Sequence, residues 1–343
     1  METRELWATL AEAHRFLAEL KGLCESLPNQ GILLDTLAIQ EAKDSSEIEN
    51  IITTHDELYA RDAAAESPAA KEVRRYVAAL RVGSEAVRAS GLIRLETVLA
   101  VQAELEQNRA GLRQLPGTVL KNEATGQVIY EPPQDGTVVE SLMGNLVDFL
   151  HAQDGLDPLL RMAIAHHQFE SIHPFYDGNG RTGRILNLLV LQREGLLDLP
   201  VLYLSRYITT TKRDYYRLLQ GVRDEGRWAE WCLYLLRGVA VTSRSAIALV
   251  KSFRELMVGT KHRLREQLPK LYSQELLNNL FRYPYTKIEF VERELAVSRV
   301  TAAKYLDQLT KAGFVRKQKT GRTNFYINEP LFALLSGVTL EGR

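Results

Sequence analysis

Residues 173–184 read HPFYDGNGRTGR, and this stretch places a histidine, an acid, two arginines and three glycines within one short segment. The flanking residues predict two helices joined by this loop. Asp157 followed by Pro158 is typical of a helix start, with aspartate as the N-cap and proline at the first helical position. Pro174 should end that helix, and we expect the second helix to start from about Arg181.

The loop has the composition of an anion-binding site. A glycine-containing loop that leads into a helix offers free N–H groups at the positive end of the helix dipole. Arg181 and Arg184 lie three positions apart, so both can face the same anion. Asp177 is a hard oxygen ligand suited to Mg²⁺, and His173 can accept a proton from a hydroxyl near neutral pH. The whole pattern favours phosphoryl or nucleotidyl transfer over a core histidine beside solvated arginines.

At every specified position the stretch resembles the signature of the Fic family, HPFxDGNGRxxR. The resemblance implies transfer of AMP from ATP to a hydroxyl side chain of a protein. It implies that His173 is the general base and that Asp177 holds the Mg²⁺ that bridges the α- and β-phosphates. Relatives that phosphorylate instead, such as the Doc toxin, carry a lysine where this chain has Gly180, so glycine favours adenylylation.

The other motif residues take their expected roles from the same resemblance. Phe175 would anchor the loop in the core. Arg184 would meet the γ-phosphate, and Arg181 would lie against the phosphates. The anion hole would be formed by Asn179 and by the backbone N–H groups of Gly178 and Gly180.

A second segment, at about 41–52, resembles the inhibitory helix of the family. It contains EAKDSSEIEN, in which Ser45, Glu49 and Asn50 match the pattern of Ser or Thr, three residues, Glu, then Gly or Asn. The resemblance implies that Glu49 pairs with Arg184 and competes with the γ-phosphate for its guanidinium. Some members use this glutamate to position a water that removes AMP, so the reverse activity stays open.

Residues 116–132 read PGTVLKNEATGQVIYEP and predict a β-hairpin with Asn122 and Gly126 in its turn. Family members place such a flap over the active site, where the target segment adds to its edge as a strand. An ordinary surface hairpin is the alternative. Further along, Tyr215 and Tyr216 resemble the tyrosines that contact adenine, whereas Arg223 stands where some relatives have asparagine.

Composition bounds the remaining possibilities. The chain has 343 residues, 45% hydrophobic and 25% charged, with 43 basic and 43 acidic side chains. Such balance argues against a chain built wholly around nucleic acid. Two cysteines, Cys24 and Cys232, are too few for a disulfide framework or a zinc site. We expect no apolar run of membrane-spanning length, no signal peptide, no membrane partner and a cytoplasmic location.

The expected fold is mainly α, a Fic-type helical bundle with a β-hairpin flap, plus a C-terminal winged-helix (α+β) domain. Helices should fill 1–100, with breaks that include Gly83, and the catalytic domain should span 101–250. A connecting helix is expected over 251–268, and the winged helix over 269–343.

The C-terminal domain should contain three helices, the third capped by Ser298, and two strands around Thr320-Gly321. The segment from Lys287 to Arg322 contains nine basic residues and four acidic ones. Such an excess of positive charge is typical of a surface that binds phosphate backbones. Winged helices also bind proteins or form dimers, so DNA and protein partners both stay open. The resemblance to dimeric relatives makes a homodimer an expectation as well.

Three functions therefore remain in view. The leading interpretation is an autoinhibited protein adenylyltransferase that uses ATP, modifies a target protein and also modifies itself. The first alternative is a related enzyme that removes AMP or uses another donor. The second is a DNA-binding regulator whose Fic domain senses nucleotide.

Overall fold

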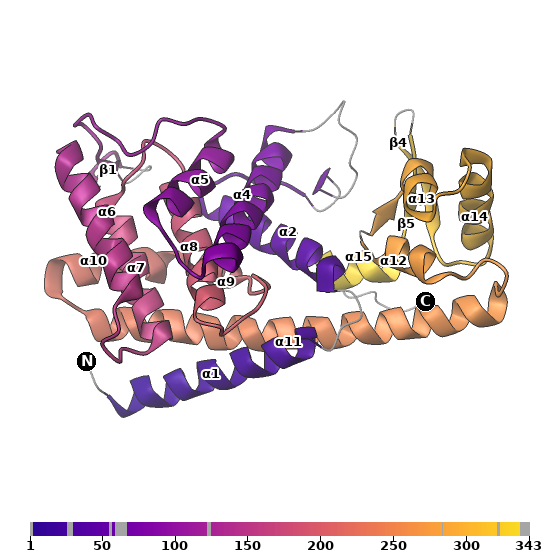
Figure 1. Cartoon of the computed structure of the whole chain (residues 1–343), viewed down its shortest axis with the longest axis horizontal. Coiled ribbons are helices and arrows are strands. Elements are labelled where there is room, and N and C mark those ends of the chain that lie inside the picture. Colours follow the sequence, from indigo (N-terminus) through magenta and orange to yellow (C-terminus); the bar gives the residue numbers. More distant parts are fainter. Residues whose placement is uncertain are drawn as a thin grey trace.

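The computed structural model describes residues 3–25, 30–54, 57–58, 67–121, 125–282, 284–320 and 323–336. Within these residues the protein is mainly α-helical, as predicted, with two small antiparallel sheets (Figure 1). The helices before the long α11 are α1 (Arg4–Glu25), α2 (Gln30–Ile48), α4 (Pro68–Ser90), α5 (Leu95–Glu106), α6 (Gly136–His151), α7 (Pro158–Ile172), α8 (Asn179–Arg193), α9 (Leu204–Thr210) and α10 (Lys212–Glu225).

Helices α7 and α8 form the centre of the helical bundle that precedes the C-terminal domain. Most of their residues are buried around the whole helix circumference, which is typical of helices enclosed by others. Helices α2, α4 and α5 pack against α8, and α6 and α11 pack against α7. Because α7 and α8 are covered on all sides, the loop that joins them is held at a fixed place in the bundle.

Gly83 does not break a helix, contrary to our prediction, and lies within α4. A Cβ at this position would lie 2.7 Å from Leu189 Cδ1 and 2.9 Å from Val101 Cγ2. The glycine therefore allows α4 to approach α8 and α5 closely. The helix ends later, where Gly91 adopts a left-handed conformation with φ of 68°.

Helix α1 packs along α11 (Trp228–Gln267) as a parallel two-helix coiled coil (Figure 1). Its buried apolar residues follow the four-three spacing of a heptad repeat: Leu6, Leu10, Ala13, Leu17, Leu20 and Cys24. Ion pairs join the helices at a constant offset of 232 residues: Glu5–Arg237, Glu12–Arg244 and Glu19–Lys251. Since both numbers of each pair rise together, the two helices run in the same direction.

Helix α11 is continuous and extends the connecting helix expected from residue 251 back to Trp228. At 1.5 Å per residue it is roughly 60 Å long, and it carries the chain from the helical bundle around α7 and α8 to the C-terminal domain (Figure 1). By length and composition it could also cross a membrane, contrary to our expectation that no run would qualify. Its most apolar window is 61% buried inside the protein, as in a core helix.

The hairpin predicted as a flap is formed by β1 (Leu120–Lys121) and β2 (Val128–Tyr130), which pair antiparallel. Asn122, which we expected in the turn, lies outside the described residues. The C-terminal domain contains the three predicted helices, α12 (Gln274–Arg282), α13 (Ile288–Leu295) and α14 (Arg299–Lys311). Ser298 caps α14 as expected, because its side chain accepts a hydrogen bond from Thr301 N.

The C-terminal sheet has one strand more than predicted. Its order is β3 (Tyr285–Thr286), β5 (Thr323–Ile327) and β4 (Arg316–Thr320), and all pairs are antiparallel. Gly321 and Arg322, expected between the last two strands, lie outside the described residues. A final helix, α15 (Glu329–Ser336), was not predicted and packs back onto α11.

Candidate active site

The loop between α7 and α8 begins at His173, which ends α7 in a left-handed conformation with φ 49° and ψ 61°. Its N–H still donates to Phe169 O at 3.0 Å, so the reversal comes directly after the last helical hydrogen bond. This conformation costs a β-carbon-bearing residue about 1–2 kcal/mol and persists only where neighbours enforce it. Asp157 and Pro158 start α7 as predicted, because Asp157 Oδ1 accepts from Leu159 N at 2.8 Å.

Helix α8 begins at Asn179, two residues earlier than we predicted, with Gly178 as its N-cap at φ 76°. The Asn179 side chain explains the earlier start. Its Oδ1 accepts from Phe175 N and its Nδ2 donates to Phe175 O, both at 2.8 Å. Asn179 is thus a brace that shapes the loop, and Phe175 is fully buried, as an anchor should be. The backbone N–H groups in the first turn of α8 are left to receive an anion.

Asp177 and His173 lie on the same loop but in different surroundings. Asp177 is exposed, and its Oδ1 accepts from Gly178 N at 2.7 Å. His173 is largely enclosed, and burial together with Arg113 and Arg223 lowers its pKa to about 4, although Glu49 and Asp177 act in the opposite direction. The imidazole is therefore neutral at pH 7 and available to accept a proton.

Arg181 and Arg184 are both 4% exposed, and Glu49 bridges them. Glu49 Oε1 lies 2.7 Å from Arg184 Nη2, and Oε2 lies 2.9 Å from Arg181 Nε. The predicted pair is present, but the same carboxylate also occupies the first arginine. A Cβ on Gly180 would lie 2.6 Å from Glu49 Oε1, so glycine at this position leaves the space that the carboxylate fills.

Ser45 and Asn50, the other two residues of the pattern, lie before and after Glu49 in the chain. Ser45 is fully buried on α2, and its Oγ and backbone O accept from Arg184 at 2.7 and 3.0 Å. Asn50 follows the end of α2 with φ 62°. Glycine and asparagine are the residues that adopt this left-handed conformation most readily, which explains the Gly-or-Asn choice at the end of the pattern.

Two further carboxylates surround Arg181 and were not predicted. Glu72, on α4, lies 2.5 Å from Arg181 Nη1, and Glu106, at the end of α5, lies 2.8 Å from Nη2. Burial raises the pKa of Glu106, against the effect of Arg181. Both acids lie far from Arg181 in sequence, so no local spacing marked them. Their contacts depend on how α4 and α5 pack beside α8.

The two tyrosines that we expected to contact adenine differ from each other in exposure. Tyr215 is 2% exposed, its hydroxyl lies 2.9 Å from His166 Nε2, and its ring contacts Trp231. Tyr216 is 48% exposed. Arg223, which replaces the asparagine of some relatives, points instead to the flap, with its guanidinium 3.7 Å from the centre of the Tyr130 ring.

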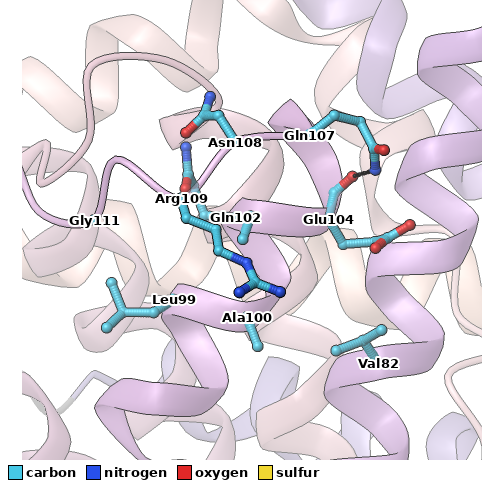
Figure 2. Close-up of a pocket in the computed structure, with 10 residues that line it drawn as sticks. Val82, Leu99, Ala100, Gln102, Glu104, Gln107, Asn108, Arg109 and Gly111 are labelled. Atoms are coloured by element: carbon cyan, nitrogen blue, oxygen red, sulfur yellow. Dashed lines mark hydrogen bonds between the residues drawn. The ribbon is translucent and has the colours of Figure 1, made fainter.

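A surface groove of about 640 Å³ is lined by residues of α4, α5 and the segment that follows α5 (Figure 2). It is lined by α4, α5 and residues 107–111, with Val82 and Leu99 at its apolar side and Glu104 and Arg109 among its polar groups. Gln102 connects it to the motif, because its Nε2 donates to Asp177 O at 3.4 Å. The residues that line the groove include neither His173 nor the two motif arginines.

Comparison with known families matches three consecutive regions of the chain. Residues 7–85 match the Fic/DOC family N-terminal domain, and residues 92–191 match the Fic/DOC family itself. Residues 256–331 match the C-terminal domain of protein adenylyltransferases that are SoFic-like. The second region contains the whole motif loop, and the first contains Glu49.

Curated relatives share the central region. A probable protein adenylyltransferase of Aquifex aeolicus is 37% identical over 83 residues, which is 24% of this chain and 26% of that protein. The protein adenylyltransferase fic-1 of Caenorhabditis elegans is 38% identical over 94 residues, which is 26% of this chain and 17% of that protein. The chain thus covers about a quarter or less of the length of these relatives.

Solved structures show the same fold over longer stretches. A Fic family protein from Desulfovibrio desulfuricans superimposes over 100% of this chain and 98% of its own, with a TM-score of 0.61 and 20% identity. Residues 134–508 of Fic-1 from C. elegans superimpose over 70% of this chain and 71% of their own, with a TM-score of 0.56 and 20% identity.

Proposed function

Because this chain belongs to the Fic/DOC family, we propose that it is a protein adenylyltransferase, which transfers AMP from ATP to a hydroxyl side chain of a target protein. The observation that carries the proposal is the placement of a neutral His173 at the end of α7, directly before the anion-binding start of α8. A proton acceptor and a phosphate site are the two groups that this reaction needs from the protein.

The reaction balances as a substitution at the α-phosphorus. The target hydroxyl oxygen forms a bond to that phosphorus, the bond to the bridging oxygen of the β-phosphate breaks, and pyrophosphate leaves. A ring nitrogen of His173 accepts the hydroxyl proton. The N–H groups in the first turn of α8 and the guanidinium groups of Arg181 and Arg184 bind and orient the phosphates.

The residues at the loop fit a Mg²⁺ ion that arrives with ATP. Asp177 offers an exposed carboxylate with one oxygen bonded to Gly178 N. Among the described residues no group of three or more potential metal ligands gathers, which agrees with a site completed by phosphates and water. Bound there, Mg²⁺ would neutralise charge on the phosphates.

We further propose that Glu49 inhibits the transfer. Its carboxylate occupies both motif arginines, so phosphate must displace an ion pair at each. We expect Glu49→Gly to raise modification of the protein by itself roughly ten- to hundredfold, the value of charge-assisted hydrogen bonds of about 1.5–3 kcal/mol. The wild type and the variant are incubated with ATP and MgCl₂, and intact mass is measured over time.

Two controls make this experiment decisive. Glu47→Gln changes an acid on the same helix whose carboxylate pairs with Lys43, and it should leave the rate unchanged. His173→Ala in the Glu49→Gly background should lower the rate by roughly 10²–10⁴ while ATP still binds. Full activity in that double variant would refute the assignment of the base. A gain of mass that does not match AMP would favour another donor, and loss of AMP from a modified target would favour the reverse reaction.

The flap and the C-terminal domain define the proposed partners. We propose that a target segment adds to the flap, and that the C-terminal domain is a winged helix whose strand β4 exposes the side chains of Arg316, Lys317 and Lys319. A DNA-binding regulator is therefore the second candidate function. Fluorescence anisotropy with duplex DNA at several salt concentrations tests it, because phosphate contacts give a steep dependence on salt. Light scattering of the same samples tests the proposed homodimer.

A further inference from the structure

The C-terminal end of α7 has an unusual set of hydrogen-bond donors. A helix leaves its last four carbonyl groups without partners inside the helix. In α7 these are the carbonyls of Glu170, Ser171, Ile172 and His173, and the last of them belongs to the proposed base. Each of the four accepts a hydrogen bond from a side chain that is connected to the flap.

Three side chains supply these donors. Arg113 Nε donates to His173 O at 2.7 Å, and its Nη2 donates to Ile172 O at 3.2 Å. Tyr130 OH donates to Ser171 O at 2.9 Å, and Arg223 Nη2 donates to Glu170 O at 3.2 Å. Arginine is well suited to this position, because its charge lies at the negative end of the helix dipole.

The same side chains hold the end of the flap, and Tyr176 of the motif loop holds its start. Tyr130 is the last residue of β2, and the Arg223 guanidinium stacks on its ring at 3.7 Å. Arg113 Nη2 also donates to Pro133 O, where the chain leaves the flap, and Tyr176 of the motif loop accepts from Gln114 N at 3.0 Å, where the chain enters it. Arg113 is 1% exposed, and its described hydrogen-bond partners are carbonyl oxygens.

We propose that Arg113, Tyr130 and Arg223 are positioning residues that join the flap and the end of α7 into one rigid unit. A target strand that adds to the flap is then placed directly relative to His173, and no hinge lies between the docking edge and the base. Arg113 holds His173 in its left-handed conformation, because Arg113 Nε donates a hydrogen bond to the carbonyl oxygen of His173. This inference rests on the proposed adenylyl transfer.

Tyr130→Phe is the mildest test, because it removes one O–H group and keeps the ring beneath Arg223. It is made in the Glu49→Gly background, and AMP incorporation at saturating ATP is followed by intact mass. We expect the rate to fall roughly three- to tenfold, the effect of one neutral hydrogen bond, with the dissociation constant of Mg·ATP by calorimetry unchanged. Arg217→Gln, an exposed arginine on the same helix as Arg223, is the matched control and should leave the rate unchanged.

Arg113 and hydrogen exchange provide an independent measurement. Arg113→Lys should recover part of the rate that Arg113→Gln loses, because an ammonium group can still donate to one of the carbonyls. In Tyr130→Phe, the backbone amides of 128–130 and of 173–176 should exchange faster together. Faster exchange at the flap alone, an unchanged rate, or a loss that is carried by ATP affinity would each overturn the proposal. If the Glu49→Gly parent transfers no AMP, the proposed function fails, and the exchange measurement still decides the coupling.

Discussion

Glu41 is a buried acid that fixes helix α2 to the rest of the molecule. It is 1% exposed on α2 and accepts hydrogen bonds from Ser205 N at 3.0 Å and from the hydroxyls of Ser205 and Tyr76. Burial outweighs these hydrogen bonds and raises the pKa of Glu41 from 4.5 to about 7. The carboxylate stands one helical turn before Ser45, so its charge state bears on how firmly α2 is held.

We expect Glu41→Gln to gain stability relative to the wild type as the pH rises. Because the folded-state pKa of Glu41 is raised, the protonated side chain contributes to the stability of the wild type below about pH 4.5. This contribution is lost as the pH rises toward 7 and the carboxyl group ionises. Glutamine does not ionise, so the difference in unfolding free energy should grow by about 3 kcal/mol between pH 4.5 and 8. Urea unfolding of both proteins at the two pH values measures it. Glu140→Gln, at an exposed position of α6, is the control, and an equal difference at both pH values would contradict the prediction.

At the scale of residues, the sequence was informative where chemistry lies within one short segment. His173, Asp177 and the two arginines could be assigned because a loop of twelve residues keeps them together. The Glu49–Arg184 pair needed a resemblance, since 135 residues separate its members. The contacts of Arg181 with the acids of α4 and α5 depend on tertiary packing. Patterns in a single sequence do not show how distant segments pack, so these contacts could not be predicted.

At the scale of elements, the end of α2 determines where Glu49 points. Asn50 is in the left-handed region, where alanine costs about 1–2 kcal/mol and glycine costs almost nothing. We expect Asn50→Ala to loosen the end of the helix and to raise self-modification roughly five- to tenfold, as measured by intact mass. Asn50→Gly loses the same contact with Lys212 and should stay at the wild-type rate. If both variants modify themselves faster by the same factor, the lost contact with Lys212, and not the backbone conformation at residue 50, causes the rise.

The coiled coil of α1 and α11 owes its stability to its seam rather than to its ion pairs. Leu17 is 1% exposed in the seam, whereas Glu19 and Lys251 expose about half of their side chains. Thermal or urea unfolding should show a loss of about 2–5 kcal/mol for Leu17→Ala and less than about 1 kcal/mol for Glu19→Gln. A Glu19→Gln effect as large as that of Leu17→Ala would show that the ion pairs, and not the apolar seam, stabilise the pairing of α1 with α11.

Local patterns predicted the helices better than their partners. The heptad spacing of α1 is visible in the sequence, but it does not say that the partner helix lies 232 residues later. Gly83 was read as a break because glycine disfavours helix, yet tertiary packing against Leu189 outweighs that preference. The two-residue strand β3 is too short to produce a recognisable alternation.

At the scale of the whole molecule, the C-terminal domain contacts the helix that carries Glu49. Helix α12 packs on α2, and Gln40 Nε2 donates to Leu335 O of α15 at 2.8 Å. Gln40→Ala leaves a buried carbonyl without this donor, so α2 should be held less firmly and self-modification should rise roughly fivefold. The same change in the Glu49→Gly background should have no effect. A similar rise in both backgrounds would show that Gln40 acts independently of Glu49.

The parallel pairing of α1 with α11 has a consequence for how the protein is made. A ribosome adds about 5–20 residues per second, so the seam of α1 waits on the order of 10 to 50 s until its partner has been translated. During that interval its leucines are exposed to chaperones and to other nascent chains. Chains that stop before α11 lack the helix that covers this seam.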